Sequence, residues 1–330
     1  MERYSYTNKI GNRLPTPLYL SDDDNTRIPY EELWSSAVRC KFVHCKHDDM
    51  SMIWHLSNIP QDREITPNID EAYIHEMRGV SLPICLHTHG VHEKISMKVY
   101  IWNNHNTVYI TFHADAESEV RFLRRAMRLH PIFGDVCINR FLYMRLLSVI
   151  GTIVCYLDIF KNSKYTLVLA GYSLGATMAQ IASPVLAGIF PDFYIKCHAF
   201  GGMKPGNDAF ARWTSSCVHE SYRIVNGNDP FVFLPFHYRW CHTSHVTLHF
   251  ERHLFVNISY KEAPWYKRFF MERGIIKHVL RTMKKSNDHL FDKYIEELWV
   301  YTRMANYLHS MGEAEIPIPT PIENETDIKN

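Results

Sequence analysis

The chain has 330 residues, of which 46% are hydrophobic and 22% are charged, and its formal net charge is +1. This length is enough to bury a sizeable core, and the composition is that of an ordinary globular protein. A charge so close to zero offers no overall attraction to nucleic acid or to an anionic membrane, so we do not expect nucleic acid as a partner.

The predicted elements begin with a helix over Tyr30–Val43, inside an N-terminal stretch, residues 1–75, that carries few other patterns. Met1–Leu20 contains no apolar h-region, so we expect no secretory signal and a cytoplasmic protein with reduced cysteines. The next predicted elements are strands at Val80–Leu86, Ser96–Trp102 and Thr107–Phe112, and a basic helical stretch at Glu117–Leu129. The second and third strands flank Asn103–Asn106, whose residues favour a hairpin turn.

An apolar run at Phe141–Phe160 has the length of a membrane span. It contains Arg145 and Asp158, however, and it leads directly into a strand. The sequence therefore predicts a helix buried in the core.

The strongest motif follows at Gly171-Tyr172-Ser173-Leu174-Gly175. A hydrophobic strand pattern, Thr166–Ala170, precedes it, and a helix pattern rich in small residues comes after it. Gly-x-Ser-x-Gly between a strand and a helix is typical of a nucleophile elbow, in which the serine lies at a sharp turn. The two glycines lack Cβ atoms and leave room for the crossing strand and helix. The pattern predicts Ser173 as a nucleophile, with the N–H groups at the helix start directed towards it.

Beyond the elbow, the patterns predict strands at Tyr194–Phe200 and Ser221–Val225, a hairpin of His245–Phe250 with Leu254–Ile258, and helices at Trp265–Lys285 and from His289 to about His309. Residues 312–330 are acidic and rich in proline, which predicts a disordered tail. Strands that alternate with helices favour an α/β fold with helices on both faces of the sheet. We expect one domain over residues 76–311, with residues 1–75 packed on it or preceding it.

A serine hydroxyl needs a histidine base, and the base needs a carboxylate that orients it. Behind an elbow these partners follow in the order acid, then histidine. Asp229 stands in a turn after the 221–225 strand, where it is either that acid or an ordinary turn aspartate. The histidines that follow it are His237, His242, His245, His249, His253, His278, His289 and His309.

Among these histidines, His289 fits the base best. It ends a polar stretch just before the final helix, where a histidine can reach over the edge of the sheet. His245 and His249 lie in an alternating strand pattern that suits a structural role, and His309 closes the final helix.

Four ordered segments resemble the class 3 (fungal-type) lipases over roughly residues 96–300. They are Gly171–Ala176 (Gly-His-Ser-Leu-Gly-Gly in the family), Phe200–Ala211, Val225–Pro230, and Asp288-His289 with Tyr294. His130-Pro131-x-Phe133 also resembles the segment that closes the family's lid. The resemblance implies an α/β-hydrolase fold with a mostly parallel central sheet and a Ser173, Asp229 and His289 triad. It also implies hydrolysis of carboxylic esters of acyl lipids, as by a triacylglycerol lipase or a phospholipase A1.

The chain departs from the family pattern in three places, of which Ala176, in place of the family's final glycine, is a tolerable change. The family has Arg-Gly-Thr or Arg-Gly-Ser where this chain has His113-Ala114-Asp115, and its hydroxyl residue donates to the oxyanion together with the N–H after the nucleophile, here that of Leu174. An ionised Asp115 carboxylate has no proton to donate, so we expect its backbone N–H to serve the oxyanion. This departure also supports an alternative, a catalytically impaired hydrolase-fold protein that binds lipid or protein. Tyr172 replaces the family's histidine, and its hydroxyl needs a partner if it is buried.

Two basic amphipathic segments, Glu117–Leu129 at the family's lid position and Trp265–Lys285, suit either transient contact with a lipid surface or an ordinary helix with one solvated face. The aromatic residues of Trp265–Lys285 also leave open the binding of nucleic acid or of a partner helix. Three groups suggest metal ligands: Cys40, His44, Cys45 and His47; His87, His89 and His92; and Cys241, His242 and His245. None of them has the paired spacing of a structural zinc site. We therefore expect neither a metal nor a cofactor.

Overall fold

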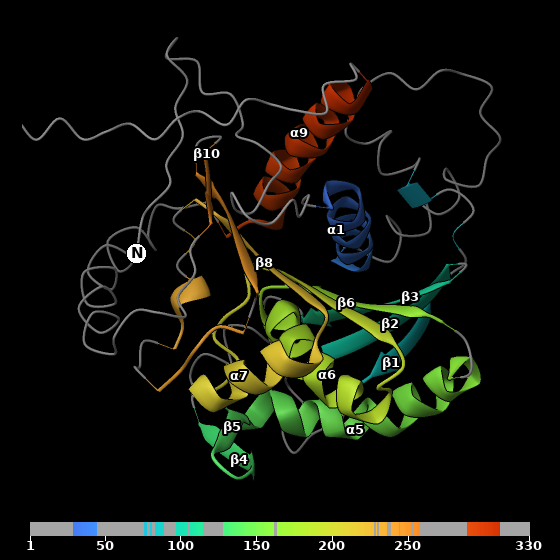
Figure 1. Cartoon of the computed structure of the whole chain (residues 1–330), viewed down its shortest axis with the longest axis vertical. Helices are drawn as coiled ribbons and strands as arrows, with labels where there is room; N and C mark the ends of the chain where they lie inside the picture. Colours follow the sequence, from blue (N-terminus) through green and yellow to red (C-terminus); the bar gives the residue numbers. More distant parts are fainter. Residues whose placement is uncertain are drawn as a thin grey trace, which may run out of the picture.

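The computed structural model describes residues 29–44, 76–77, 80, 83–88, 97–104, 106–114, 128–161, 164–227, 229, 231–235, 239–243, 245–251, 254–257 and 289–310 (Figure 1). The predictions for Asp115, for residues 117–127 and 265–285, and for the tail lie outside these residues.

The centre of the fold is an eight-stranded sheet in the order β1-β2-β3-β6-β7-β8-β9-β10. Its strands are β1 (Ile84–His87), β2 (Met97–Asn104), β3 (Thr107–Ala114), β6 (Thr166–Tyr172), β7 (Tyr194–Phe200), β8 (Glu220–Asn226), β9 (Val246–Glu251) and β10 (Leu254–Asn257). The neighbours from β3 to β9 pair in parallel, whereas β1, β2 and β10 pair antiparallel with the strands beside them. The predicted mostly parallel sheet is confirmed.

Helices cover both faces of this sheet, as predicted (Figure 1). On one face lie α1 (Tyr30–His44) and α9 (Phe291–Ser310), and on the other lie α5 (Arg140–Leu157), α6 (Leu174–Ile189) and α7 (Asp208–Cys217). Each interface contains its own buried apolar cluster, so the sheet separates two cores. The central strand β6 is buried along nearly its whole length, which explains its continuous apolar sequence.

Polar contacts also join α1 to the sheet. Ser36 Oγ lies 2.7 Å from Nδ1 of the fully buried His198 on β7. Lys196, also on β7, donates to Glu32 of α1 at 2.6 Å and lies 3.2 Å from Glu220 of β8. Burial raises the pKa of Glu32, while burial and the charge of Lys196 lower the pKa of His198 to about 3.

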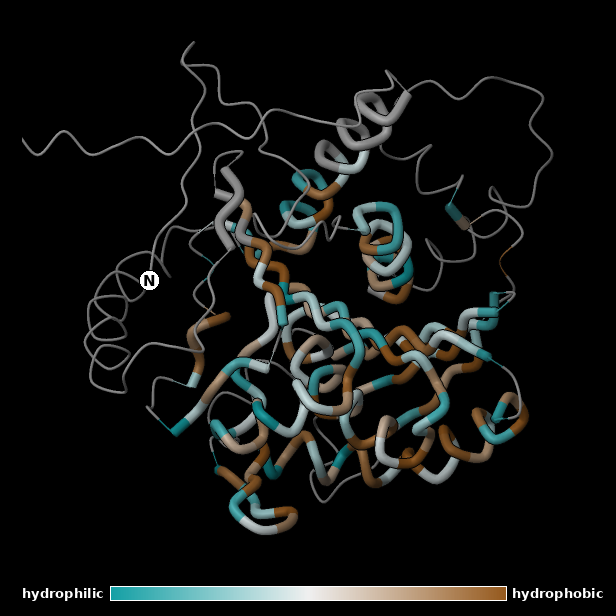
Figure 2. The backbone as a smooth tube through the Cα atoms, viewed as in Figure 1, coloured by the Kyte–Doolittle hydropathy of each residue, from teal (hydrophilic) through white to brown (hydrophobic). Residues whose placement is uncertain are grey.

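The apolar run at 141–160 forms α5 and a short 3-10 turn, Asp158–Phe160. The helix is long and apolar enough to cross a membrane by length and composition alone. In the fold, Leu146 and Ile153 lie on its buried face in the core, whereas Met144 and Leu147 are exposed on its outer side. Figure 2 shows hydrophobic residues (brown) along both α5 and the central strands.

Three elements differ from the sequence predictions. The first strand begins at Ile84 instead of Val80, directly after Pro83, which has no N–H for a sheet ladder. Leu129 lies at the start of a small hairpin, β4 (Leu129–Phe133) with β5 (Val136–Asn139), instead of at the end of a helix. Helix α7 was not predicted, although Asn207 marks its start by accepting a hydrogen bond from the N–H of Phe210 at 3.0 Å.

Candidate active site

Ser173 occupies the single residue between β6 and α6. Its φ of 54° is the only positive value of a non-glycine residue among those that the structure describes, and such a conformation is strained. Two backbone contacts hold it: its N–H donates to the carbonyl of Phe200 at 2.8 Å, and its carbonyl accepts from the N–H and the hydroxyl of Thr177, each at 3.2 Å. The sharp turn expected of an elbow is therefore present at Ser173.

The flanking glycines allow this turn because the backbone is closely packed on both sides. A Cβ added to Gly171 would lie 2.4 Å from the carbonyl carbon of Gly175. A Cβ added to Gly175 would lie 2.1 Å from the carbonyl oxygen of Phe112 on β3. The prediction that both positions require the absence of a side chain is confirmed.

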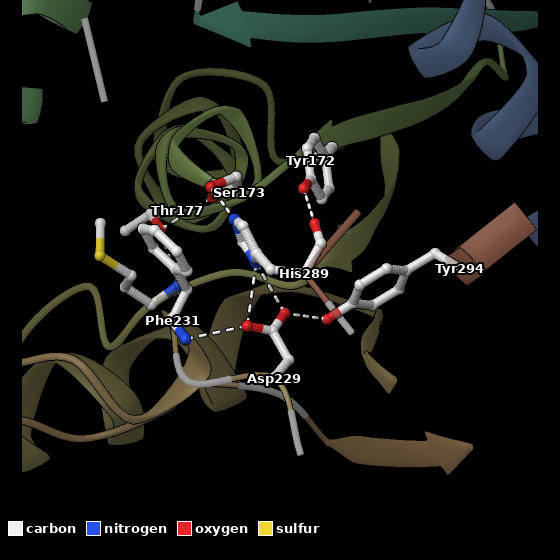
Figure 3. Close-up of polar contacts among 8 residues, drawn as sticks. Tyr172, Ser173, Thr177, Asp229, Phe231, His289 and Tyr294 are labelled. Carbon is white, nitrogen blue, oxygen red and sulfur yellow. Dashed lines mark hydrogen bonds and ion pairs between the residues drawn. The ribbon is translucent and has the colours of Figure 1, made fainter. Parts of the chain in front are cut away.

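The structure brings Ser173, His289 and Asp229 into one hydrogen-bonded series (Figure 3). Ser173 Oγ lies 2.8 Å from His289 Nε2. His289 Nδ1 lies 2.9 Å from Oδ1 and 2.8 Å from Oδ2 of Asp229. This geometry suits a neutral imidazole that carries its proton on Nδ1, donates it to the carboxylate and offers Nε2 as an acceptor to the serine hydroxyl. The catalytic roles of the three residues stay a prediction.

Asp229 is fully buried, and its carboxylate has further donors. The N–H of Phe231 donates to Oδ1 at 2.8 Å, and the hydroxyl of Tyr294 on α9 donates to Oδ2. Burial and the neighbouring Asp229 raise the pKa of Tyr294 well above its usual value, so its hydroxyl keeps its proton and remains a donor. A buried carboxylate is tolerated where such donors surround it. Gly201 leaves the space, because a Cβ there would lie 2.9 Å from the Tyr294 hydroxyl.

Aromatic rings hold the imidazole of His289 from its sides. The ring of Phe231 stacks on it with centroids 3.8 Å apart, and the ring of Tyr172 lies 5.1 Å away. Tyr172 is 7% exposed, and its hydroxyl donates to the backbone carbonyl of His289, so the expected partner for this hydroxyl is present. No sequence pattern pointed to Phe231, whose contribution comes from a backbone N–H and a ring in the turn after Asp229.

The other histidine candidates are not joined to Ser173 by any hydrogen bond among the described residues. His245 Nε2 lies 3.4 Å from the carbonyl of Ser215, and burial together with Arg223 and Lys204 lowers the pKa of His242 well below its usual value. His237, His253 and His278 lie outside the described residues, as do the side chains of His249 and His309. Across the described ranges, no group of three or more His, Cys, Asp or Glu residues is arranged to hold a metal ion.

Of the predicted oxyanion groups, Leu174 is buried and begins α6, so its N–H stands at the positive end of that helix. Asp115 follows the last residue of β3 and lies outside the described residues. His113, two residues before it, has its pKa lowered to about 4 by burial and by Lys98 on the paired strand.

Comparison with known proteins confirms the resemblance. The family model "Lipase (class 3)" matches residues 122–239. Secreted mono- and diacylglycerol lipase 1 of Fusarium solani is 34% identical over 86 residues, so the match spans only a quarter of either chain.

Among solved structures, the lipase from Rhizopus microsporus var. chinensis aligns with a TM-score of 0.55 and 15% identity over 79% of this chain and 88% of that one. The mono- and diacylglycerol lipase from Aspergillus oryzae aligns with a TM-score of 0.52 and 15% identity over 68% of this chain and 80% of that one. At these identities, the likeness shows a shared α/β-hydrolase fold.

Proposed function

We propose that this chain, which contains a class 3 lipase segment at residues 122–239, is a serine hydrolase that cleaves carboxylic esters of acyl lipids. The observation that carries the proposal is the continuous hydrogen-bonded series from Ser173 Oγ through His289 to Asp229. Its three members come from the elbow, from the turn after β8 and from the residues before α9, in the chain order of α/β-hydrolases.

The proposed reaction uses each contact in turn. As Ser173 Oγ attacks the ester carbonyl, its proton passes to Nε2 of His289, and the imidazolium that forms is stabilised by Asp229. His289 then returns the proton to the leaving alcohol, and an acyl-enzyme remains on Ser173. Water attacks the acyl-enzyme with His289 again taking the proton, which releases the fatty acid and restores the serine hydroxyl.

The negative oxygen formed in each attack needs donors. We propose the N–H of Leu174 as one of them, supported by the start of α6 beside Ser173. For the second donor we propose the backbone N–H of Asp115, because a carboxylate side chain has no proton to give. A donor of this kind contributes on the order of 3 kcal/mol to the transition state.

Labelling with a fluorophosphonate probe tests the nucleophile directly. The folded wild-type protein should gain one covalent adduct at Ser173, and Ser173→Ala should gain none. Ser216→Ala is the matched control, because Ser216 is an exposed serine on α7 outside the site, and its variant should label like wild type. A folded wild-type protein that resists the probe would contradict the proposal.

Asp115 supports the second candidate, a hydrolase-fold protein that binds lipid or protein without turnover. A carboxylate about 4 Å from an oxyanion would repel it by roughly 1–4 kcal/mol. If the chain is an enzyme limited by this side chain, Asp115→Thr should raise kcat. If Asp115→Thr abolishes the activity instead, the role proposed for this position is wrong.

The finer substrate class is also open to measurement. Fatty-acid release from triacylglycerol, monoacylglycerol and phospholipid, each compared with Ser173→Ala, will rank the three classes. The similar Fusarium and Aspergillus proteins are mono- and diacylglycerol lipases by name, which makes partial glycerides the first substrates to try.

A further inference from the structure

Tyr172 contacts the proposed base by a route that does not involve Asp229. It is the last residue of β6, directly before Ser173, and its hydroxyl donates to the backbone carbonyl of His289 (Figure 3). The two residues are 117 positions apart in the sequence. A side chain next to the nucleophile is therefore bonded to the backbone of the base.

The ring of Tyr172 also supports the start of α9, the helix that follows His289. It stacks on Phe291, the first residue of α9, with centroids 4.5 Å apart and 22° between the planes. It meets Tyr294, which donates to Asp229, edge-on at 6.0 Å. The ring of Tyr172 therefore packs against the segment in which the chain passes from His289 into α9.

These contacts fix a degree of freedom that Asp229 leaves open. Asp229 holds the imidazole at Nδ1 and Phe231 stacks on its face, but both contacts are with the ring, which still shifts when the backbone of His289 shifts. The hydroxyl of Tyr172 holds that backbone at the carbonyl. A displacement of about 1 Å at a reacting group is enough to cost on the order of 100-fold in rate.

We propose that Tyr172 is a positioning residue, whose hydroxyl fixes the backbone of His289 so that Nε2 stays within reach of Ser173 Oγ. This inference rests on the proposed hydrolase function. It concerns a feature of this chain, because the class 3 lipase pattern has histidine at this position, and an imidazole is shorter than a phenol.

The test compares two tyrosine-to-phenylalanine variants. Tyr172→Phe removes the hydroxyl and keeps the ring that stacks on Phe291. Tyr222→Phe is the matched control: Tyr222 is a buried tyrosine on β8 whose hydroxyl is bonded to Glu220, away from the site. We expect Tyr172→Phe to lower kcat for a soluble short-chain ester about tenfold with KM unchanged. Tyr222→Phe should keep the wild-type kcat, and both variants should show similar, small shifts of the unfolding midpoint.

A nuclear magnetic resonance measurement separates positioning from general stability. The Nδ1 proton of His289, shared with Asp229, should exchange with solvent faster in Tyr172→Phe than in wild type or Tyr222→Phe. If Tyr172→Phe keeps both the kcat and the proton exchange of Tyr222→Phe, the inference is overturned. A fall in kcat that is matched by a large loss of stability, with the His289 proton unchanged, also overturns it, because the role is then only structural.

The remaining outcomes are also informative. If the wild-type protein is not labelled by the fluorophosphonate, the proposed function fails, while the proton exchange still tests the contact with His289. If Tyr172→Phe does not fold, the rate at which the Tyr172 hydroxyl proton exchanges with solvent in the wild-type protein tests the contact instead. Slow exchange supports a hydroxyl held by the carbonyl, and fast exchange overturns the proposal.

Discussion

Replacing Gly175 with alanine should disable the elbow while leaving every proposed catalytic side chain in the sequence. The added Cβ would lie 2.1 Å from the carbonyl oxygen of Phe112 and 2.8 Å from its carbonyl carbon. Real Cβ atoms do not approach other heavy atoms closer than 3.0 Å, so α6 and β3 must separate by about 0.9 Å along this contact. Neither atom belongs to a flexible side chain, and the strain has no easy release.

The size of the effect follows from that displacement. Inserting a methyl group into a closely packed site costs about 1–3 kcal/mol, and we expect the upper end because both partners are backbone. Ser173 lies two residues before Gly175, so the same shift moves its Oγ relative to His289. A misplacement of about 1 Å lowers kcat on the order of 100-fold.

The control is Gly188→Ala near the end of the same helix. A Cβ added to Gly188 meets no atom within 4 Å. Alanine there should stabilise the fold by up to about 1 kcal/mol through its higher helix propensity and leave kcat unchanged. Urea unfolding and hydrolysis of a soluble ester measure both quantities. If Gly175→Ala unfolds like wild type and keeps full activity, the packing argument for the elbow is refuted.

Three further changes test other parts of the fold. Tyr294→Phe removes a donor to the buried carboxylate of Asp229, so it should lower the free energy of unfolding in urea by about 1.5–3 kcal/mol and also lower kcat. An unchanged unfolding curve would contradict the role of this hydrogen bond. His198 has a folded-state pKa of about 3, below its unfolded value near 6.5, so below that pH the unfolded chain binds a proton that the folded chain does not. Stability should therefore fall by up to about 1.4 kcal/mol per pH unit as the pH drops from 6.5 towards 3, and His198→Gln should show a shallower fall in urea unfolding; equal slopes would refute this assignment. Leu146→Ala on the buried face of α5 should lower the free energy of unfolding by about 2–5 kcal/mol, and Met144→Ala on its exposed face by no more than about 0.5 kcal/mol. Equal losses would mean that α5 does not pack as described.

The elbow was the part of the site that could best be predicted from the sequence, because most of the residues that form it are neighbours in the chain. A strand buried on both faces requires a continuous apolar run, and the tight turn from β6 into α6 requires Gly171. Gly175 is required by the close approach of α6 to Phe112 on β3. The same holds for the β2–β3 hairpin, whose register pairs Asn104 with Thr107 around the predicted turn. Apart from the contact between Gly175 and Phe112, these features depend on residues that lie close together in the sequence.

The groups that surround Asp229 could not be predicted from the sequence in the same way. The chain order of acid and histidine suggested Asp229 and His289, but the donors of the carboxylate come from different sources. One is a backbone N–H, which no residue type identifies, and another is the hydroxyl of Tyr294, which approaches only because α9 packs on the sheet. Pairings across such separations depend on the tertiary fold, and no local pattern encodes them.

Packing of α9 in turn links the site to the start of the chain. Besides the sheet, α9 packs against α1, where Thr302 Oγ1 lies 3.5 Å from the carbonyl oxygen of Tyr30 and the two helices share one apolar cluster. The division of the chain at residue 75 stays a prediction, and α1 lies on the N-terminal side of it. Helix α1 also packs on β3 and on β6, the strand that ends at the elbow. A helix that contacts both β6, which ends at the elbow, and the helix after His289 contributes to the relative position of the proposed nucleophile and base.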